Sequence, residues 1–187
     1  RADEIDLLRE IQQPNERLLL YVKFARERLD LVEQFLAKEA PGRATLVRQT
    51  LEQYTKIVDA LDMVTDDAVR RGAELDTGMP VVAEAEKEMA ARLRKIAGRK
   101  PADFMLFQFA LEQAIETTED SLEMALEDLA DRAKKLEARD AKEQKERESM
   151  MRPEEVEAKR AAEQKEAELK KKTPTLLRPG EVPEKQR

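Results

Sequence analysis

The sequence predicts an all-α protein: an antiparallel four-helix bundle-like domain, with a short helix before it and a long charged helical extension after it. Three observations support this fold class. The 187 residues include only 5 Gly, 2 Tyr and no Trp, and Ala, Leu, Glu, Lys and Arg are abundant, which is a helix-forming composition. Apolar residues recur at steps of three and four over long stretches. Proline and glycine fall mainly at the ends of these stretches.

The first two expected helices lie on either side of Pro14. Residues 3–12 form a short amphipathic segment, and Pro14 suits the first turn of the helix that follows. That second helix ends at the turn Pro41-Gly42. Its apolar stripe is broad enough to predict a buried face. The stripe consists of Leu18, Val22, Ala25, Leu29, Val32 and Leu36, flanked by Tyr21, Phe24, Leu31 and Phe35.

Arg28 interrupts the second apolar stripe of this helix, between Phe24 and Leu31. A long arginine side chain can reach from an apolar face to water, or it can meet a carboxylate of a facing helix. We prefer the first interpretation. The candidate acids for the second are Asp59, Asp62 and Asp66.

Two further helices follow at residues 44–70 and 80–98. The first ends in basic residues and Gly72, which helix C-termini favour. The second follows the loop at residues 76–80 and ends at Gly98. Their apolar positions are Val47, Leu51, Tyr54, Val58, Leu61 and Ala68 in the first, and Val82, Ala85, Met89, Leu93 and Ile96 in the second.

The last expected helix begins near Ala102 and continues without a break past Leu136. Residues 1–136 are therefore expected to form the bundle. Residues 137–172 form a charged, partly helical extension that Pro153 interrupts. Pairs such as Glu143 with Arg147 have the i,i+4 spacing that supports a solvated helix. Residues 173–187 contain three prolines and a glycine, and predict an irregular tail.

The composition excludes most familiar active sites. With no Cys and no His, the chain has no thiol nucleophile, no thiolate or imidazole metal ligand and no imidazole base. No catalytic, cofactor-binding or metal-binding residue is predicted. No apolar run approaches the 20 or so residues of a membrane-spanning helix. Overall acidity, with a net charge of −6, disfavours nucleic-acid binding.

The charge is strongly segregated along the chain. Residues 101–131 carry nine acids and no Lys or Arg. The acids recur at helical spacing and predict an acidic face beside the buried one, where like charges repel. We prefer neutralisation within the chain, or simple solvation of the acids, to docking of a basic partner, and we prefer docking to a calcium or magnesium site. The candidate docking face is Glu112, Glu116, Glu119, Asp120, Glu123 and Glu127.

A candidate basic patch lies just before this acidic segment. It could hold an anionic lipid, a phosphate or an acidic protein, but cations at a helix C-terminus also complement the backbone dipole, which is the interpretation we prefer. The patch consists of Arg92, Arg94, Lys95, Arg99 and Lys100. Four methionines on or near apolar faces are expected to fill gaps in the core. They are Met63, Met89, Met105 and Met124.

These observations favour a non-enzymatic helical interaction or structural protein with an unidentified protein partner. Two alternatives remain: a periplasmic chaperone-like or envelope-sensing protein, and, ranked last, an enzyme that uses carboxylates alone. The chain begins with Arg1 instead of Met, which is compatible both with removal of a signal peptide and with an arbitrary boundary. We lean to an exported protein. The partner, the process and the oligomeric state are left open.

Overall fold

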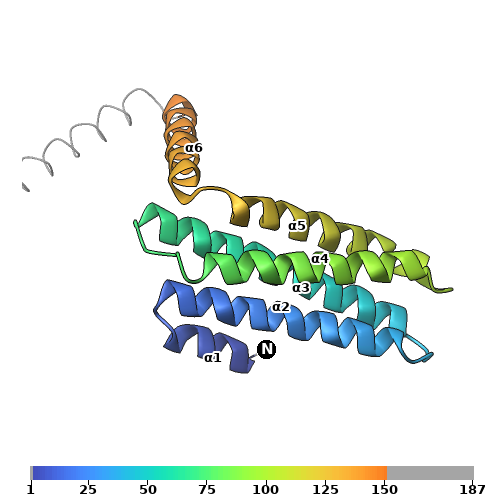
Figure 1. Ribbon diagram of the computed structural model, residues 1–187. Helices are drawn as coiled ribbons and strands as arrows, with labels where there is room; N and C mark the ends of the chain where they lie inside the picture. The colour runs from blue at the N-terminus through green and yellow to red at the C-terminus, as the bar shows by residue number, and fades with distance from the viewer. Residues whose placement is uncertain (1, 151–187) are drawn as a thin grey trace, which may run out of the picture. The chain divides into compact units, whose positions relative to one another are not determined.

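The computed structural model describes residues 2–150, and within these residues it contains helices and no strand. The all-α prediction is confirmed. The chain divides into two compact units, residues 1–138 and 139–187, and only residues 139–150 of the second unit are described. The helices (Figure 1) are α1 (Ala2–Glu10), α2 (Pro14–Leu36), α3 (Arg43–Arg70), α4 (Met79–Arg99), the short 3-10 helix η1 (Phe104–Leu106), α5 (Gln108–Leu126) and α6 (Leu129–Met150).

Helices α2, α3, α4 and α5 pack as a four-helix bundle. Around the bundle, α2 contacts α3, α3 contacts α5, α5 contacts α4, and α4 contacts α2. Consecutive helices run in opposite directions (Figure 1), as short connections require. The connection from α3 to α4 crosses the bundle diagonally. As a result α4 lies beside α2 and runs parallel to it.

The core of the bundle consists of the apolar stripes that helical periodicity predicts. Each fully buried Leu, Val or Met contributes on the order of 1.5–3 kcal/mol through removal from water. Tyr54 and Phe107 are the largest of the fully buried side chains. The core residues of α2 to α5 include Leu18, Val22, Leu29, Val32, Val47, Leu51, Val58, Leu61, Val82, Met89, Leu93, Ile96 and Leu111.

The diagonal connection is held by Asn15, near the start of α2. Its side-chain amide donates a hydrogen bond to the Glu74 carbonyl at 2.9 Å and accepts one from the Gly78 backbone N–H at 2.9 Å. A Cβ atom at position 78 would lie 2.6 Å from the Asn15 Oδ1 atom, so this approach requires glycine. Leu75, fully buried, anchors the loop in the core.

The last expected helix is broken in two, so the prediction of one continuous helix is wrong. α5 ends at Leu126, and Glu127 adopts an extended conformation with ψ 146°. Asp128 then starts α6, because its carboxylate accepts hydrogen bonds from the backbone N–H groups of Ala130 at 2.9 Å and Asp131 at 3.3 Å. An aspartate at this position satisfies donors that the first helical turn leaves unpaired.

Arg28 does not reach water, contrary to the interpretation preferred from the sequence. It is 3 % exposed, and its guanidinium donates to both carboxylate oxygens of Glu4 at 2.8 Å and to Gln53 Oε1 at 3.1 Å. The partner acid comes from α1, not from α3. A buried charge must be paired, and here the pair fastens α1 to the bundle.

The predicted extension is only partly described. The Glu143–Arg147 ion pair forms within α6. Pro153, the remainder of the extension to residue 172 and the tail at 173–187 lie outside the described residues. Over the part that the structure describes, no helix has the length and hydropathy needed to cross a membrane.

Candidate functional site

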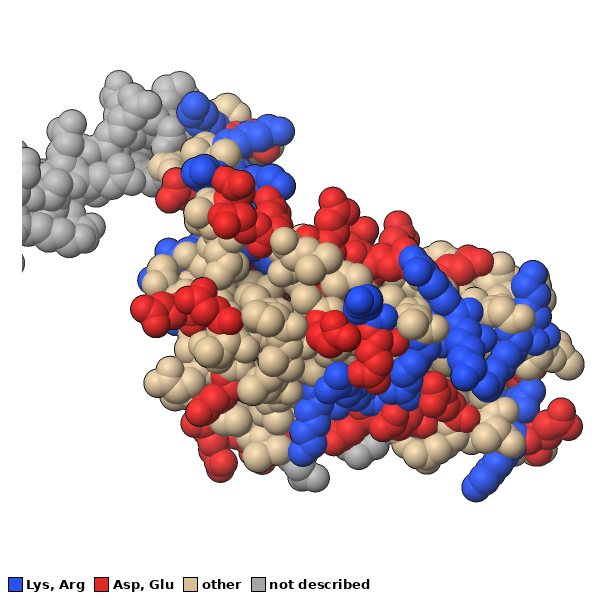
Figure 2. All heavy atoms as spheres, in the orientation of Figure 1, with Lys and Arg blue, Asp and Glu red and all other residues tan. Residues whose placement is uncertain are grey.

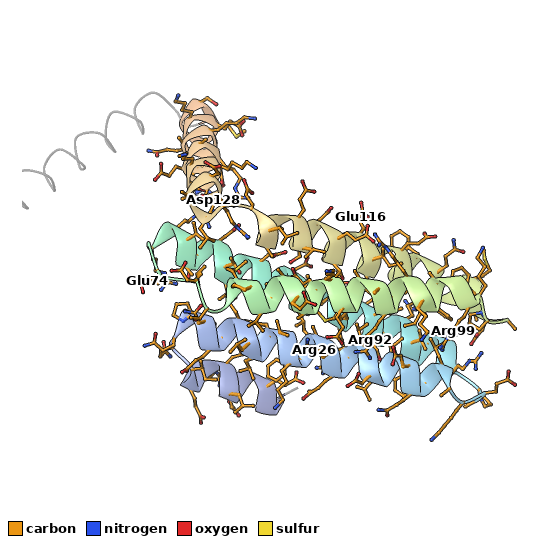
Figure 3. The ribbon with its side chains drawn as sticks, viewed as in Figure 1. Arg26, Glu74, Arg92, Arg99, Glu116 and Asp128 are labelled. Carbon is orange, nitrogen blue, oxygen red and sulfur yellow. The ribbon has the colours of Figure 1, made fainter. Side chains whose placement is uncertain are left out.

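The predicted acidic face lies mostly on the side of α5 that points away from the bundle. Glu116 is labelled there in Figure 3, and Figure 2 shows acidic side chains along this edge. Two of the six candidate acids are paired within the chain. Glu119 accepts a hydrogen bond from Arg94 of α4 at 2.8 Å, and Glu127, in the turn after α5, lies 2.5 Å from the Lys135 ammonium.

Four acids of this face remain exposed, and we call them the acidic stripe. Within residues 2–150 none of the four forms an ion pair, although Glu112 accepts a hydrogen bond from the Gln108 side chain at 2.7 Å. Neutralisation by the described part of the chain is therefore incomplete. The acidic stripe consists of Glu112, Glu116, Asp120 and Glu123.

The predicted basic patch is divided between two sides of α4. Arg92 faces α2, where it binds Asp30 at 2.6 Å and Glu33 at 3.0 Å. Arg94 faces α5. The remaining cations, Lys95, Arg99 and Lys100, are exposed and pair with no acid among the described residues. Figure 3 shows Arg92 and Arg99 at different positions along the length of α4. In Figure 2 the basic side chains over α2 and α4 alternate with acidic ones.

An apolar surface adjoins the acidic stripe at the start of α5. Met105, Leu106 and Phe109 are 79 %, 68 % and 78 % exposed, and we call them the apolar end. The neighbouring Phe104 and Phe107 turn inward instead, and their rings meet edge to face at a centroid distance of 5.7 Å. Apolar side chains of this size are usually scattered singly over a soluble surface, so three within five residues are an uncommon concentration of exposed apolar groups.

Phe109 also borders a groove of about 250 Å³ between α3 and α5. The acids Glu52 and Asp59 of α3 line the opposite side of this groove, together with Lys56. Phe109 and the acidic stripe follow one another at steps of three and four, which places them on the same face of α5. One continuous surface therefore joins an aromatic side chain to a row of carboxylates.

Sequence reasoning missed the apolar end. Met105 was expected in the core, and that expectation is wrong, as it is for Met63, which is 73 % exposed. Phe109 was not recognised. Its position in the sequence could have predicted its exposure. Phe109 lies two residues after the buried Phe107, and residues two apart on a helix lie on different faces.

A second polar group occupies the interior of the bundle, near the other end of α5. The Ser121 hydroxyl lies 2.5 Å from Glu86 Oε1 of α4 and 2.8 Å from Asp62 Oδ1 of α3. Glu86 is fully buried, and its Oε2 atom has no hydrogen-bond partner among the described residues. Burial raises the pKa of Glu86 to about 7 and that of Asp62 to about 6. The Asp62 carboxyl further raises the pKa of Glu86, and Asp66 and Asp59 further raise that of Asp62.

Two more buried contacts flank this group. The Tyr54 hydroxyl bonds the Thr118 hydroxyl at 2.7 Å, and Thr118 in turn donates to the Ala114 carbonyl at 2.6 Å. Because Thr118 already donates to that carbonyl, Tyr54 is the donor between the two hydroxyls. Burial raises the pKa of Tyr54 well above its usual value.

Arg132 of α6 completes the buried polar region. It is 3 % exposed and donates to Asp66 Oδ1 at 2.7 and 2.9 Å and to the Met124 carbonyl at 3.1 Å. The contact with Met124 joins the first turns of α6 to the end of α5. The sequence placed Arg132 near the end of the last expected helix, where nothing distinguished it from the charged residues around it.

The arrangement limits the chemistry that either region can perform. Among residues 2–150, no group of three or more acids has the arrangement of a metal site. Glu86 is enclosed on all sides in this conformation, so a substrate cannot reach it. Comparisons with models of protein families, with curated proteins and with solved structures found no match for this chain.

Proposed function

We propose that the protein is a non-enzymatic interaction module, and that the outer face of α5 binds a partner protein through a basic amphipathic helix. The observation that carries this proposal is the apolar end, because three large side chains remain exposed directly beside a groove and an acidic row. A basic amphipathic helix offers the complementary pattern: apolar residues on one stripe and Lys or Arg beside them.

The apolar end supplies the affinity in this proposal. Burying a side chain such as Phe109 contributes roughly 1.5–3 kcal/mol, and aromatic side chains at the centre of an interface commonly dominate its binding energy. Phe109 borders a groove whose far wall is α3, so an apolar side chain of the partner can insert between α3 and α5.

The acidic stripe selects the charge of the partner. Its carboxylates lie along one face of α5. Across the groove Glu52 pairs with Arg48, and Lys56 lines the wall beside Asp59, so the acidic stripe is the main source of negative charge on this surface. Complementary charge raises the rate of association and disfavours acidic competitors, and it loses its effect as salt is raised. An acidic or neutral helix would not be attracted by these carboxylates.

An enzymatic role is not part of the proposal. A carboxylate-only enzyme needs a pair of acids in an accessible pocket. The pair that the fold brings together, Asp62 and Glu86, is bridged by Ser121, and Glu86 is fully buried. These features favour a role of that pair in the bundle interior instead.

The proposal is tested by fluorescence anisotropy with a labelled synthetic helix of Leu and Lys at amphipathic spacing. We expect the full chain to bind it, and Phe109→Ser to weaken binding at least about tenfold, which is the loss that one buried aromatic side chain implies. Glu116→Lys is expected to weaken binding at low salt only. The matched control is Leu19→Ser, a half-exposed apolar residue of α2 on the opposite side of the bundle.

Two results would contradict the proposal. The first is equal affinity of wild type and Phe109→Ser for the basic helix. The second is equal binding of a Leu and Glu peptide of the same spacing. If an unfolded, neutral polypeptide binds as well as the basic helix and its aggregation is suppressed, the chaperone-like alternative replaces the proposal.

A further inference from the structure

We propose that Glu86, Ser121 and Asp62 form a proton-dependent latch between α4, α5 and α3, which is closed when Glu86 is protonated and opens when it ionises. The latch lies in the interior of the bundle and is independent of the proposed docking surface on the outer face of α5.

The first argument is the number of hydrogens. The Ser121 Oγ atom lies within hydrogen-bond distance of an oxygen of each carboxyl, at 2.5 Å from Glu86 and 2.8 Å from Asp62. A serine hydroxyl carries one hydrogen and can donate one bond. Both contacts are hydrogen bonds only if one carboxyl is protonated and donates to Ser121. With both carboxyls ionised, one oxygen would face the Ser121 oxygen with no hydrogen between them.

The second argument decides which carboxyl holds the proton. Glu86 is fully buried, and its Oε2 atom has no partner within residues 2–150. A buried carboxylate with an unpaired oxygen is far more costly than a neutral carboxylic acid in the same place. Asp62 is only partly buried, so its ionised form keeps some contact with water. Glu86 therefore donates to Ser121, and Ser121 donates to Asp62.

The charged groups around the latch do not remove this preference. From α3, Asp62 and Tyr54 face Glu86, and Asp59 and Asp66 lie around Asp62; from α6, Arg132 acts on both carboxyls. Arg132 is already bound to Asp66. From α2, the charged side chains turn to other residues of α4: Arg26 binds Glu88, and Asp30 and Glu33 bind Arg92.

The direction of the pH effect follows from the raised pKa of Glu86. Its folded value of about 7 lies above its ordinary value of 4.5. The folded state therefore binds a proton that the unfolded state has released between these values. The stabilisation is complete below about pH 4.5, falls as the pH rises and is lost above about pH 7. Between about pH 4.5 and pH 7, the contact of α5 with α4 is then sensitive to acidity.

The test compares the thermal unfolding of the full chain with that of Glu86→Gln between pH 5 and pH 8. The Gln amide donates to Ser121 at every pH, so the variant lacks this titration. We expect the Tm of wild type minus that of the variant to fall by about 6 °C over this range, because the pKa of Glu86 rises from 4.5 in the unfolded chain to about 7 in the folded one. The control is Glu84→Gln, an exposed acid of the same helix, for which the difference stays constant.

A wild-type minus Glu86→Gln difference that does not change between pH 5 and pH 8 overturns the proposal. A second measurement uses the wild-type chain, so its main result does not depend on the folding of a variant. Infrared spectroscopy of the wild-type chain at pH 6 should show the carbonyl band of a protonated, buried carboxyl, and the band should disappear above pH 8. Absence of the band at pH 6 likewise overturns the proposal, and Ser121→Ala should shift the band, because its hydrogen-bond acceptor is removed.

Discussion

The two ends of α5 depart from the usual distribution of polarity in opposite directions. At its start Phe109, together with Met105 and Leu106 of the preceding η1, carries a large apolar side chain into solvent. Towards its end, Thr118 and Ser121 carry hydroxyl groups into the core, where they meet Tyr54 and Glu86. The exposed apolar groups stabilise nothing in the folded chain by themselves. The buried polar groups are tolerated because nearly every one has a partner.

This difference separates residues that serve the fold from residues that are free to serve binding. When a buried hydroxyl loses its hydrogen-bond partner, the free energy of unfolding decreases. Removing an exposed apolar side chain leaves the free energy of unfolding almost unchanged. Substitutions of the buried residues of α5 should therefore lower the free energy of unfolding, and substitutions of its exposed apolar residues should not. The following substitutions are ordered by the size of the expected effect.

Phe107→Ala and Phe109→Ala make the sharpest comparison. Phe107 is 1 % exposed and Phe109 is 78 % exposed, although they are two residues apart. Removing the buried ring leaves a cavity and should lower the free energy of unfolding by about 4 kcal/mol. Removing the exposed ring should change it by less than about 0.5 kcal/mol. Urea unfolding measures both. Equal losses would mean that Phe109 is packed in the folded chain and does not belong to a docking surface.

Arg132→Ala tests the buried end of the comparison. The substitution removes the bonds to Asp66 and to the Met124 carbonyl, within a nearly solvent-free contact. We expect a loss of about 2 kcal/mol, together with faster hydrogen exchange of the first turns of α6, because Arg132 holds them to α5.

The control for Arg132 is Lys134→Ala. Lys134 pairs with Asp131 on an exposed surface, where such a pair contributes about 0.5 kcal/mol or less. If Arg132→Ala costs no more than Lys134→Ala, the buried pair does not hold the first turns of α6 to the bundle.

Much of this fold could be predicted because its signals are local. The helix ends at Pro14, Pro41 and Gly72 follow from backbone geometry: Gly72, with φ 65°, allows the Ala73 N–H to reach the Ala68 carbonyl at 2.9 Å. The stripes of apolar residues on α2 to α4 needed only periodicity. The break at Asp128 was not predictable in this way, because no proline or glycine marks it and the capping acid is one of several in the segment.

The candidate sites depend on which helices meet, and this is what the sequence does not show. Glu86 adjoins the core stripe that contains Ala85 and Met89, but its burial requires α3 and α5 to close over α4. The exposed face of α5 was predicted from spacing alone. The apolar end was not predicted, because Phe109 is exposed only if no other helix covers it, and the sequence does not show which helices meet.

Tyr54→Phe tests a single buried hydrogen bond. It removes the bond to Thr118 at 2.7 Å but leaves Thr118 bound to the Ala114 carbonyl. The expected loss is about 1 kcal/mol by urea unfolding. The matched control is Tyr21→Phe on α2, because the Tyr21 hydroxyl bonds nothing within residues 2–150 and its loss should be near zero. Equal effects would show that the hydroxyl inside the bundle adds no stability.

The smallest effect is expected from Arg94→Ala, which acts on the binding surface and not on the core. Arg94 is exposed and neutralises Glu119 at 2.8 Å, so its removal should leave the free energy of unfolding within about 0.5 kcal/mol of wild type. It adds one free carboxylate beside the acidic stripe. Affinity for the basic amphipathic peptide should then rise about twofold at low salt, and the gain should vanish at high salt.

Arg26→Ala is the control for this last comparison. It breaks another exposed pair, with Glu88, on the side of the bundle formed by α2 and α4. Net charge changes by the same amount in both variants, so a gain common to both reflects overall charge. A gain confined to Arg94→Ala locates the binding of basic peptides on α5, next to Glu119. Unchanged affinity in both variants would show that the carboxylates of α5 do not select the partner, and would leave the apolar end alone as its determinant.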